Sequence, residues 1–479
     1  MRVVLADLKG KGGHVSKDTV AGGYGSRFRG TSATTRIIEI LRRIYQNFPS
    51  IHTAYLTSIF ANAGHEVVLT RDRVVPGDLG LVLSSIVDYR NEMRWAQDFR
   101  KACGSPVGFY GTMATHLPGP LSGAADFLIQ GEPEQAALRL AAGERFQGAV
   151  ISQAIGNLDT LPFPQWAETK RKRFSYNASR SLRPTAHIFP VLSSRSCPEF
   201  CTYCPHRITA SYRARSPQNV LDELEYLCNR FGQVDLIFRD PLFTQQRDRS
   251  SAIADGIIRK NLPVHFECET RLDELDEDLL DLLYRAGLRS ITFGVESLDP
   301  VTLKKVARRY IPQEHQKRIL SYCRDKGIRT TGFYVFGFLT DTAESIRATI
   351  DFSIELNSST ALYKILTPYP GTPLRKQMES LVSEPDLEKF DGYTPTFRHP
   401  NLSHEQLVFL LNSAYAKFYF RPSWGLNFFG LQKHFTKWAR QWDAYAMQRH
   451  YESDVRAGLT GVQHSPILDA QSLSTSAGD

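Results

Sequence analysis

The stretch Ser196-Cys-Pro-Glu-Phe-Cys-Thr-Tyr-Cys-Pro-His206 is the most informative part of this 479-residue chain. It carries Cys197, Cys201 and Cys204 in a Cys-x3-Cys-x2-Cys loop directly after a predicted strand at residues 187–192. Three cysteine thiolates on one loop can bind three irons of a [4Fe–4S] cluster and leave the fourth iron open to an outside ligand. We therefore expect these three cysteines to bind such a cluster.

A structural zinc ion is the main alternative for this loop, with His206 as the fourth ligand of a Cys3His site. Zinc modules usually combine two Cys-x2-Cys pairs, and the sequence has no second pair. The cluster is therefore favoured. We expect the remaining cysteines, which stand apart from one another, to be small buried side chains: Cys103, Cys228, Cys268 and Cys323.

Short apolar strands alternate with helical patterns on both sides of the cysteine loop. Over residues 186–390, six such strand–helix units predict a partial (β/α)6 barrel, whose chemistry lies at the carboxyl ends of its strands. Residues 1–155 show the same alternation and predict a doubly wound, Rossmann-like α/β domain. The expected fold class is therefore α/β.

Two further regions complete the expected organisation. Residues 156–185 combine prolines, serines and a basic run, which is the composition of a linker. Residues 391–479 begin with a capping-box pattern at Ser403, continue as an aromatic-rich helical region, and end in a polar tail that we expect to be disordered. The aromatic stretch could cap the barrel, or its apolar face could contact a membrane surface or a hydrophobic substrate.

From the cysteine loop onward, the sequence resembles the radical S-adenosylmethionine (SAM) superfamily, with one family-like motif at the end of each predicted barrel strand. The resemblance implies that Asp240 lies in the motif that holds the SAM amino group, and that Glu269 and Arg271 lie near the SAM carboxylate. It further implies that Glu296 lies near the ribose and Gly337 beside the adenine.

Each of these residues also has a purely structural alternative. Asp240 could cap the turn that follows it, and Glu296 could form an ion pair with Arg271 inside the barrel mouth. Gly332 and Gly337 could serve close packing alone. SAM binding is favoured because the short motifs occur in the family's order, each at the end of a predicted strand.

A doubly wound domain in front of this barrel resembles the cobalamin-binding domain of B12-dependent radical SAM enzymes. Residues 125–134 resemble the turn that ends that domain. Cobalamin would then lie at the carboxyl ends of the strands, where we expect contacts from Ser84, Ser85, Gly111 and Gly131. The sequence has no Asp-x-His-x-x-Gly motif, so no histidine is expected on the cobalt, and a domain that binds no corrinoid is the alternative.

The resemblance implies an enzyme that uses the cluster, SAM and cobalamin to methylate an unactivated carbon in a biosynthetic pathway. An adenosyl-radical cyclisation, ring contraction or oxidation without methyl transfer is the alternative, and a sensor that binds an Fe–S cluster or corrinoid is the alternative of a different class. Methylthiotransferases need three cysteines in the first domain, where this chain has only Cys103. The implied partners are a small-molecule substrate, either polar or hydrophobic, and an electron donor such as flavodoxin or ferredoxin.

The composition agrees with an ordinary globular protein, since 42% of the residues are hydrophobic and 23% are charged. No apolar run approaches the roughly 20 residues of a membrane-spanning helix, and no secretory signal follows Met1, so the expected location is the cytoplasm. The net charge of +8 is mild and scattered, which gives no reason to expect nucleic-acid binding.

Overall fold

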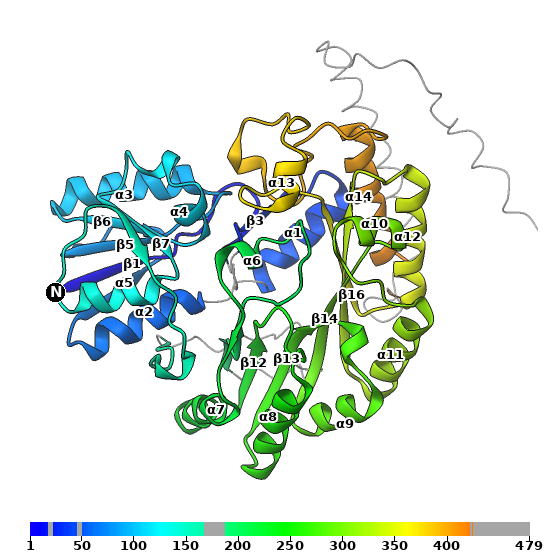
Figure 1. The fold of residues 1–479 in the computed structure, drawn as a ribbon, viewed down its shortest axis with the longest axis horizontal. Helices are drawn as coiled ribbons and strands as arrows, with labels where there is room; N and C mark the ends of the chain where they lie inside the picture. The colour runs from blue at the N-terminus through cyan, green and yellow to red at the C-terminus, as the bar shows by residue number, and fades with distance from the viewer. Residues whose placement is uncertain (18–22, 46–49, 167–186, 422–423, 425–479) are drawn as a thin grey trace, which may run out of the picture.

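Two parallel six-stranded sheets form the core of the structure, a computed structural model that describes residues 1–17, 23–45, 50–166, 187–421 and 424. Figure 1 shows the first sheet at the N-terminal end and the second, strongly curved sheet in the larger body beside it. The predicted α/β fold class is confirmed. The boundaries expected between the four regions remain predictions. The first sheet lies within residues 2–152 and the second within residues 187–365.

The first sheet has the strand order β4-β1-β5-β6-β7-β8. Its strands are β1 (Arg2–Ala6), β4 (Glu66–Thr70), β5 (Leu79–Leu83), β6 (Val107–Tyr110), β7 (Phe127–Gly131) and β8 (Gly148–Ser152). Alternate side chains of β1 point to opposite faces, and both faces are covered. Val3 and Leu5 pack with α2 (Ile51–Asn62) and α5 (Pro133–Ala141). Val4 and Ala6 pack with α3 (Tyr89–Cys103) and α4 (Thr112–His116).

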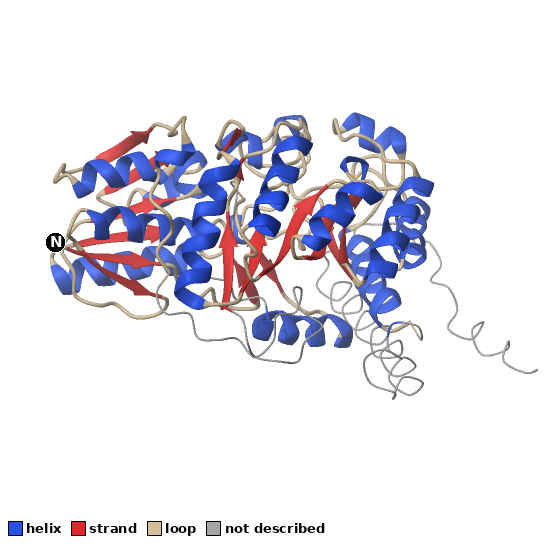
Figure 2. Ribbon diagram, turned by 90° about the horizontal axis from the view of Figure 1, so that it is seen from below, coloured by secondary structure: helices blue, strands red, loops and turns tan. Residues whose placement is uncertain are grey.

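The second sheet has the strand order β9-β12-β13-β14-β15-β16, which follows the chain. Its strands are β9 (His187–Val191), β12 (Val234–Phe238), β13 (Val264–Thr270), β14 (Leu288–Glu296), β15 (Arg329–Phe336) and β16 (Thr360–Ile365). The main helices that connect or cover these strands lie outside the curve (Figures 1 and 2): α7 (Pro217–Phe231), α8 (Arg247–Arg259), α9 (Glu277–Arg285), α11 (Gln313–Lys326), α12 (Ala343–Leu356) and α14 (His404–Tyr419). Right-handed crossovers of this kind curl a parallel sheet into a partial barrel.

The chain leaves the first sheet after β1 and returns at α2; we call residues 7–50 the crossing segment. It contains the hairpin of β2 (His14–Ser16) and β3 (Ser26–Phe28), followed by α1 (Ala33–Tyr45). Helix α1 packs against α14 of the barrel, as Figure 1 shows. The buried Arg42 of α1 donates hydrogen bonds to the hydroxyls of Tyr393 (2.7 Å) and Tyr415 (3.0 Å). The crossing segment therefore ties the two bodies together.

The start of the C-terminal region also packs on the barrel. Ser403 caps α14 in the predicted capping box with Gln406. The indole Nε1 of Trp424 donates to the carbonyl of Ser359 at 3.1 Å. The rest of the aromatic stretch and the polar tail lie outside the described residues. Among the described helices, none is both long enough and apolar enough to cross a membrane.

Candidate functional site

The cysteine loop follows the short strand β10 (Ser194–Arg195) and is held at the carboxyl ends of the barrel strands. It leaves β10 through Ser196, whose φ of 63° turns the chain sharply. The backbone N–H of Thr202 donates to Val306 O (3.0 Å), and Thr202 O accepts from the N–H of Leu374 (3.1 Å). Two different parts of the barrel rim therefore fix the middle of the loop.

The thiols on this loop fit a metal cluster. Cys201 is buried, and Cys197 and Cys204 are half-buried. Burial raises the pKa of Cys204 to about 12 and also raises that of Cys197, so these two thiols stay protonated without a metal. Binding of metal supplies the positive charge that deprotonates such thiols.

A [4Fe–4S] cluster binds each cysteine through a different iron, so its ligands share a loop without converging on one point. Cys197, Cys201 and Cys204 lie on one such loop. Within the described ranges, no three histidine, cysteine, aspartate or glutamate side chains converge so as to hold a single metal ion.

Arg308 lies between the cysteine loop and the end of β14, and the sequence motifs did not indicate it. Its Nη1 lies 4.0 Å from Cys201 Sγ, and its Nη2 donates to Gly294 O at 2.8 Å. The same Nη2 lies 3.7 Å from Glu296 Oε1. Arg308 thus places a positive charge beside one cysteine of the motif.

Glu296 ends β14 in a strained conformation, with φ of 66° and an irregular register beside it. Burial raises its pKa, while Arg308, Lys364 and a hydrogen bond from Tyr203 oppose that rise. A Cβ on Gly294 would lie 2.1 Å from Glu296 Oε1, so only glycine leaves room for this carboxylate. Non-glycine residues at positive φ cost roughly 1–3 kcal/mol and cluster at functional sites.

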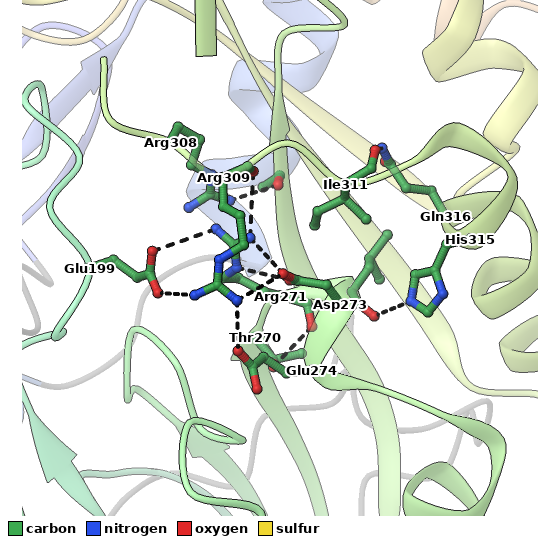
Figure 3. Close-up of polar contacts among 12 residues, drawn as sticks. Glu199, Thr270, Arg271, Asp273, Glu274, Arg308, Arg309, Ile311, His315 and Gln316 are labelled. Carbon is green, nitrogen blue, oxygen red and sulfur yellow. Dashed lines mark hydrogen bonds and ion pairs between the residues drawn. The ribbon is translucent and has the colours of Figure 1, made fainter. Parts of the chain in front are cut away.

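Arg271 belongs to an ion-pair network that includes the cysteine loop (Figure 3). Its side chain is 3% exposed, and its Nε and Nη2 donate to the two oxygens of Asp273 at 2.9 and 2.8 Å. Glu199 of the cysteine loop lies 3.9 Å from Arg271 Nη1 and pairs with Arg309 at 2.8 Å. Arg271 therefore pairs with Asp273 and Glu296 with Arg308, rather than with each other. Through Glu199, the network also holds the cysteine loop.

The remaining predicted SAM contacts differ in how accessible they are. Glu269 is about one-quarter exposed and pairs with Arg239 at the strand ends. Asp240 is fully buried and accepts from the N–H and hydroxyl of Ser193 (3.1 and 2.8 Å). It therefore caps the segment that leads into the cysteine loop. Gly337, with φ of 91°, donates its N–H to Asp341 Oδ2 at 2.8 Å.

The predicted cobalamin contacts lie at the carboxyl edge of the first sheet. There they form hydrogen bonds and close backbone contacts with other residues of the chain. Ser84 Oγ donates to Tyr110 O (2.7 Å) and accepts from the N–H of Ala114 (3.1 Å). Gly111 and Gly131 have φ of 105° and 104°. A Cβ on Gly131 would lie 2.3 Å from the carbonyl of the neighbouring strand, so this glycine serves close approach of backbone.

A buried lysine of the crossing segment fills the corner beside Ser85. Ser85 donates its N–H and hydroxyl to Glu92 at 2.9 and 2.7 Å. Lys17 Nζ lies 2.8 Å from Glu92 Oε1 and 3.1 Å from Asp88 Oδ2. Sequence reasoning missed Lys17, because its two carboxylates are more than 70 residues away and no motif joins them.

Residues 191–353, which span the cysteine loop and five of the six strand ends, match the family model of the radical SAM superfamily. This part of the chain is a radical SAM domain. An uncharacterised methyltransferase of Pyrococcus horikoshii is 26% identical over 272 residues, which cover 56% of this chain and 58% of the relative. The bacteriochlorophyllide d C-12(1)-methyltransferase of Chlorobaculum tepidum is 26% identical over 340 residues, 69% of this chain and 72% of that protein.

The radical SAM methyltransferase TsrM from Kitasatospora setae, solved with cobalamin and a [4Fe–4S] cluster bound, shares the fold over both bodies. The TM-score is 0.61 at 16% identity, and the superposition covers 94% of this chain and 99% of TsrM. The first domain and the barrel of this chain therefore form one architecture that a solved structure also has.

Proposed function

We propose that this chain is a cobalamin-dependent radical SAM enzyme that methylates an unactivated carbon of a small molecule. The observation that carries the proposal is the cysteine loop, held at the strand ends of the barrel beside a doubly wound domain. The methyltransferase relatives and the TsrM-like architecture support it. With their cofactors bound, such sites supply an adenosyl radical that removes a hydrogen atom and a methyl group that replaces it.

The residues of the barrel rim divide into two groups by their proposed roles. We assign Cys197, Cys201 and Cys204 to the cluster, and the partly exposed Glu269 and the largely buried Glu296 to direct SAM contacts. The fully buried Asp240 and Arg271, together with Gly337, hold the loops that surround SAM. Rigid loops keep the reacting carbon close to the radical and exclude water.

The first domain would hold cobalamin at the carboxyl edge of its sheet, beside Gly111 and Gly131 and without a histidine on the cobalt. The buried Ser84 and Ser85 would shape this edge through their hydrogen bonds to Tyr110, Ala114 and Glu92. His116 at the end of α4 lies near the barrel, since its Nδ1 is 3.7 Å from the place of a Cβ on Gly371. We assign it to packing. Nitrogen hyperfine coupling in the paramagnetic resonance spectrum of bound cobalt(II), lost in His116→Ala, would instead make it a ligand.

The test of the proposal needs no substrate. Anaerobically reconstituted, reduced protein with hydroxocobalamin and SAM labelled in its methyl group should release 5′-deoxyadenosine and yield a corrinoid that carries the label. Deoxyadenosine without corrinoid binding would favour a cyclase or oxidase and overturn the methyltransferase assignment. Failure to cleave SAM in protein that holds its cluster would favour a sensor.

The proposed surroundings of the enzyme follow from this chemistry. The cluster needs a one-electron donor such as flavodoxin or ferredoxin, and the cytoplasm supplies both this donor and SAM. The proposed substrate is a small molecule. Reduction of the cluster by purified flavodoxin, followed by its absorbance, tests the donor.

A further inference from the structure

The hairpin at the base of the cysteine loop places two arginines side by side. Strand β10 pairs antiparallel with β11 (Arg213–Ala214), so that Arg195 lies directly opposite Arg213. Cβ atoms of such a pair are about 4.5–5.5 Å apart, and like charges directly opposite each other destabilise a hairpin. The hairpin that closes the cysteine loop therefore needs counter-charges from elsewhere.

The first domain supplies both counter-charges. Glu132 bridges the two arginines: its Oε2 lies 3.1 Å from Arg195 Nη1, and its Oε1 accepts from Arg213 Nη2. Glu134 Oε1 accepts from Arg195 Nη2 at 2.8 Å. We call these four residues the hairpin clamp. Arg195, Glu132 and Glu134 are 5%, 8% and 1% exposed, so water does not compensate their charges.

The backbone around Glu132 and Glu134 orients both side chains toward the hairpin. Gly131 turns the chain at the end of β7, and the hydroxyl of Ser152 donates to Glu132 O and accepts from the N–H of Ala136. Glu134 lies in the first turn of α5, where the helix dipole favours a carboxylate. Burial alone would raise its pKa, but Arg195 and His52 lower the pKa of Glu134 below the ordinary value, so the carboxylate is ionised.

The barrel holds the same hairpin from the opposite side. Asp240 accepts from Ser193 and from the hydroxyl of Ser194, directly before Arg195. Arg213 also donates through Nη1 to Ile155 O, beyond the end of β8. The base of the cysteine loop is therefore fixed only when both bodies contribute their carboxylates.

We infer that Glu132 and Glu134 are positioning residues that set the geometry of the cluster through Arg195 and Arg213. The inference rests on the proposed cluster at Cys197, Cys201 and Cys204. Removal of one partner of a buried ion pair leaves an uncompensated buried charge, which is strongly unfavourable. Loss of either carboxylate therefore displaces the hairpin, and the cysteine loop that begins one residue later moves with it.

The test compares matched glutamate-to-glutamine variants of the full-length protein. Glu132→Gln and Glu134→Gln each remove a charge of the hairpin clamp. Glu388→Gln removes a charge that pairs with Arg27 (3.3 Å) and Arg90 (3.5 Å) of the N-terminal half, far from the hairpin in sequence. For each variant, iron per chain, the paramagnetic resonance spectrum of the reduced cluster and its midpoint potential are measured after anaerobic reconstitution.

We expect a loss of iron or a shifted spectrum and potential in Glu132→Gln and Glu134→Gln, and wild-type values in Glu388→Gln. Glu134→Asp keeps the charge, so its iron content, spectrum and potential should lie closer to those of the wild type. This variant therefore separates the loss of the charge from a simple failure to fold. Folded Glu132→Gln and Glu134→Gln variants with wild-type iron, spectrum and potential would overturn the inference. A wild-type protein that binds no cluster would overturn the proposed function instead.

Discussion

The guanidinium of Arg308 lies 4.0 Å from the Sγ of Cys201, although 107 residues separate the two in the chain. Arg308 Nη2 also donates to Gly294 O, which holds the guanidinium in place. A cationic donor beside a thiolate ligand favours the more negative, reduced state of a cluster, because net charge and hydrogen bonds to sulfur set the potential. Arg308 is therefore the residue that we expect to tune the cluster.

Replacement of Arg308 should change the reduction potential while the cysteines stay in place. Arg308→Gln removes the charge and should lower the midpoint potential, whereas Arg308→Lys keeps the charge and should stay closer to the wild type. A redox titration followed by paramagnetic resonance measures both. Equal potentials in the wild type and Arg308→Gln would reduce Arg308 to a role in packing.

The three loop cysteines should behave as one set. Cys197→Ala, Cys201→Ala and Cys204→Ala should each lower the iron content and abolish SAM cleavage, since a cubane with a missing ligand is lost or inactive. Cys323→Ala, at a fully buried position on α11, is the control and should keep iron and activity. Iron analysis and chromatography of 5′-deoxyadenosine give the result; full activity in any loop variant would contradict the cluster assignment.

Glu296 should act on SAM rather than on the cluster. Glu296→Gln removes the charge at the end of β14 but keeps the shape of the side chain. A charge-assisted hydrogen bond contributes roughly 1.5–3 kcal/mol, so the SAM dissociation constant should rise about 10- to 100-fold at unchanged iron content. Equilibrium binding of SAM to the anaerobic holoprotein measures this, and an unchanged constant would return Glu296 to a structural role.

Asp341 should make stability depend on pH. Burial raises the pKa of Asp341 to about 7, although its carboxylate accepts the N–H groups of Gly337 and Phe338. The folded state then keeps a proton that the unfolded chain releases near pH ~4, so Asp341 lowers stability progressively between about pH 4 and about pH 7. The difference in pKa corresponds to roughly 4 kcal/mol.

Asp341→Asn removes this titration and keeps an oxygen that accepts both N–H groups. The thermal midpoint of the variant, relative to that of the wild type, should therefore increase as the pH rises from about 5 to about 8. A constant difference between the two proteins across that range would show that Asp341 stays ionised in the folded state.

Local patterns predicted most of the two sheets. The barrel strand expected at residues 187–192 is β9 (His187–Val191), because buried parallel strands appear in the sequence as short apolar runs. The prediction lacked β8, the hairpin β2–β3 and α1. Strand β8 is a partly exposed edge whose Ile151 is 73% exposed, so its apolar signal is weak.

The candidate site could be predicted only where its residues lie on one short loop. The spacing of Cys197, Cys201 and Cys204 indicates cluster ligands without any knowledge of the fold, and this assignment stays a prediction. The hairpin clamp and Arg308 were not predicted, because their contacts join residues 61 to 107 positions apart and depend on how the two bodies pack. Asp240 was predicted as a SAM contact, but its hydrogen bonds to Ser193 and Ser194, which precede it by 47 and 46 residues, were not predicted.

The crossing segment has a consequence for how the protein is made. Strand β1 pairs with β4 and β5, which both lie within the first 83 residues. Arg42 of α1 instead bonds to Tyr393 and Tyr415, which are synthesised 351 and 373 positions later. Chains emerge from the ribosome N-terminus first, and domains generally fold as they emerge. The first sheet therefore closes during translation while α1 stays without its partners until almost the whole barrel has been synthesised. The two bodies are thus not independent modules. If the first were expressed alone, helix α1 would lose the barrel residues against which it packs.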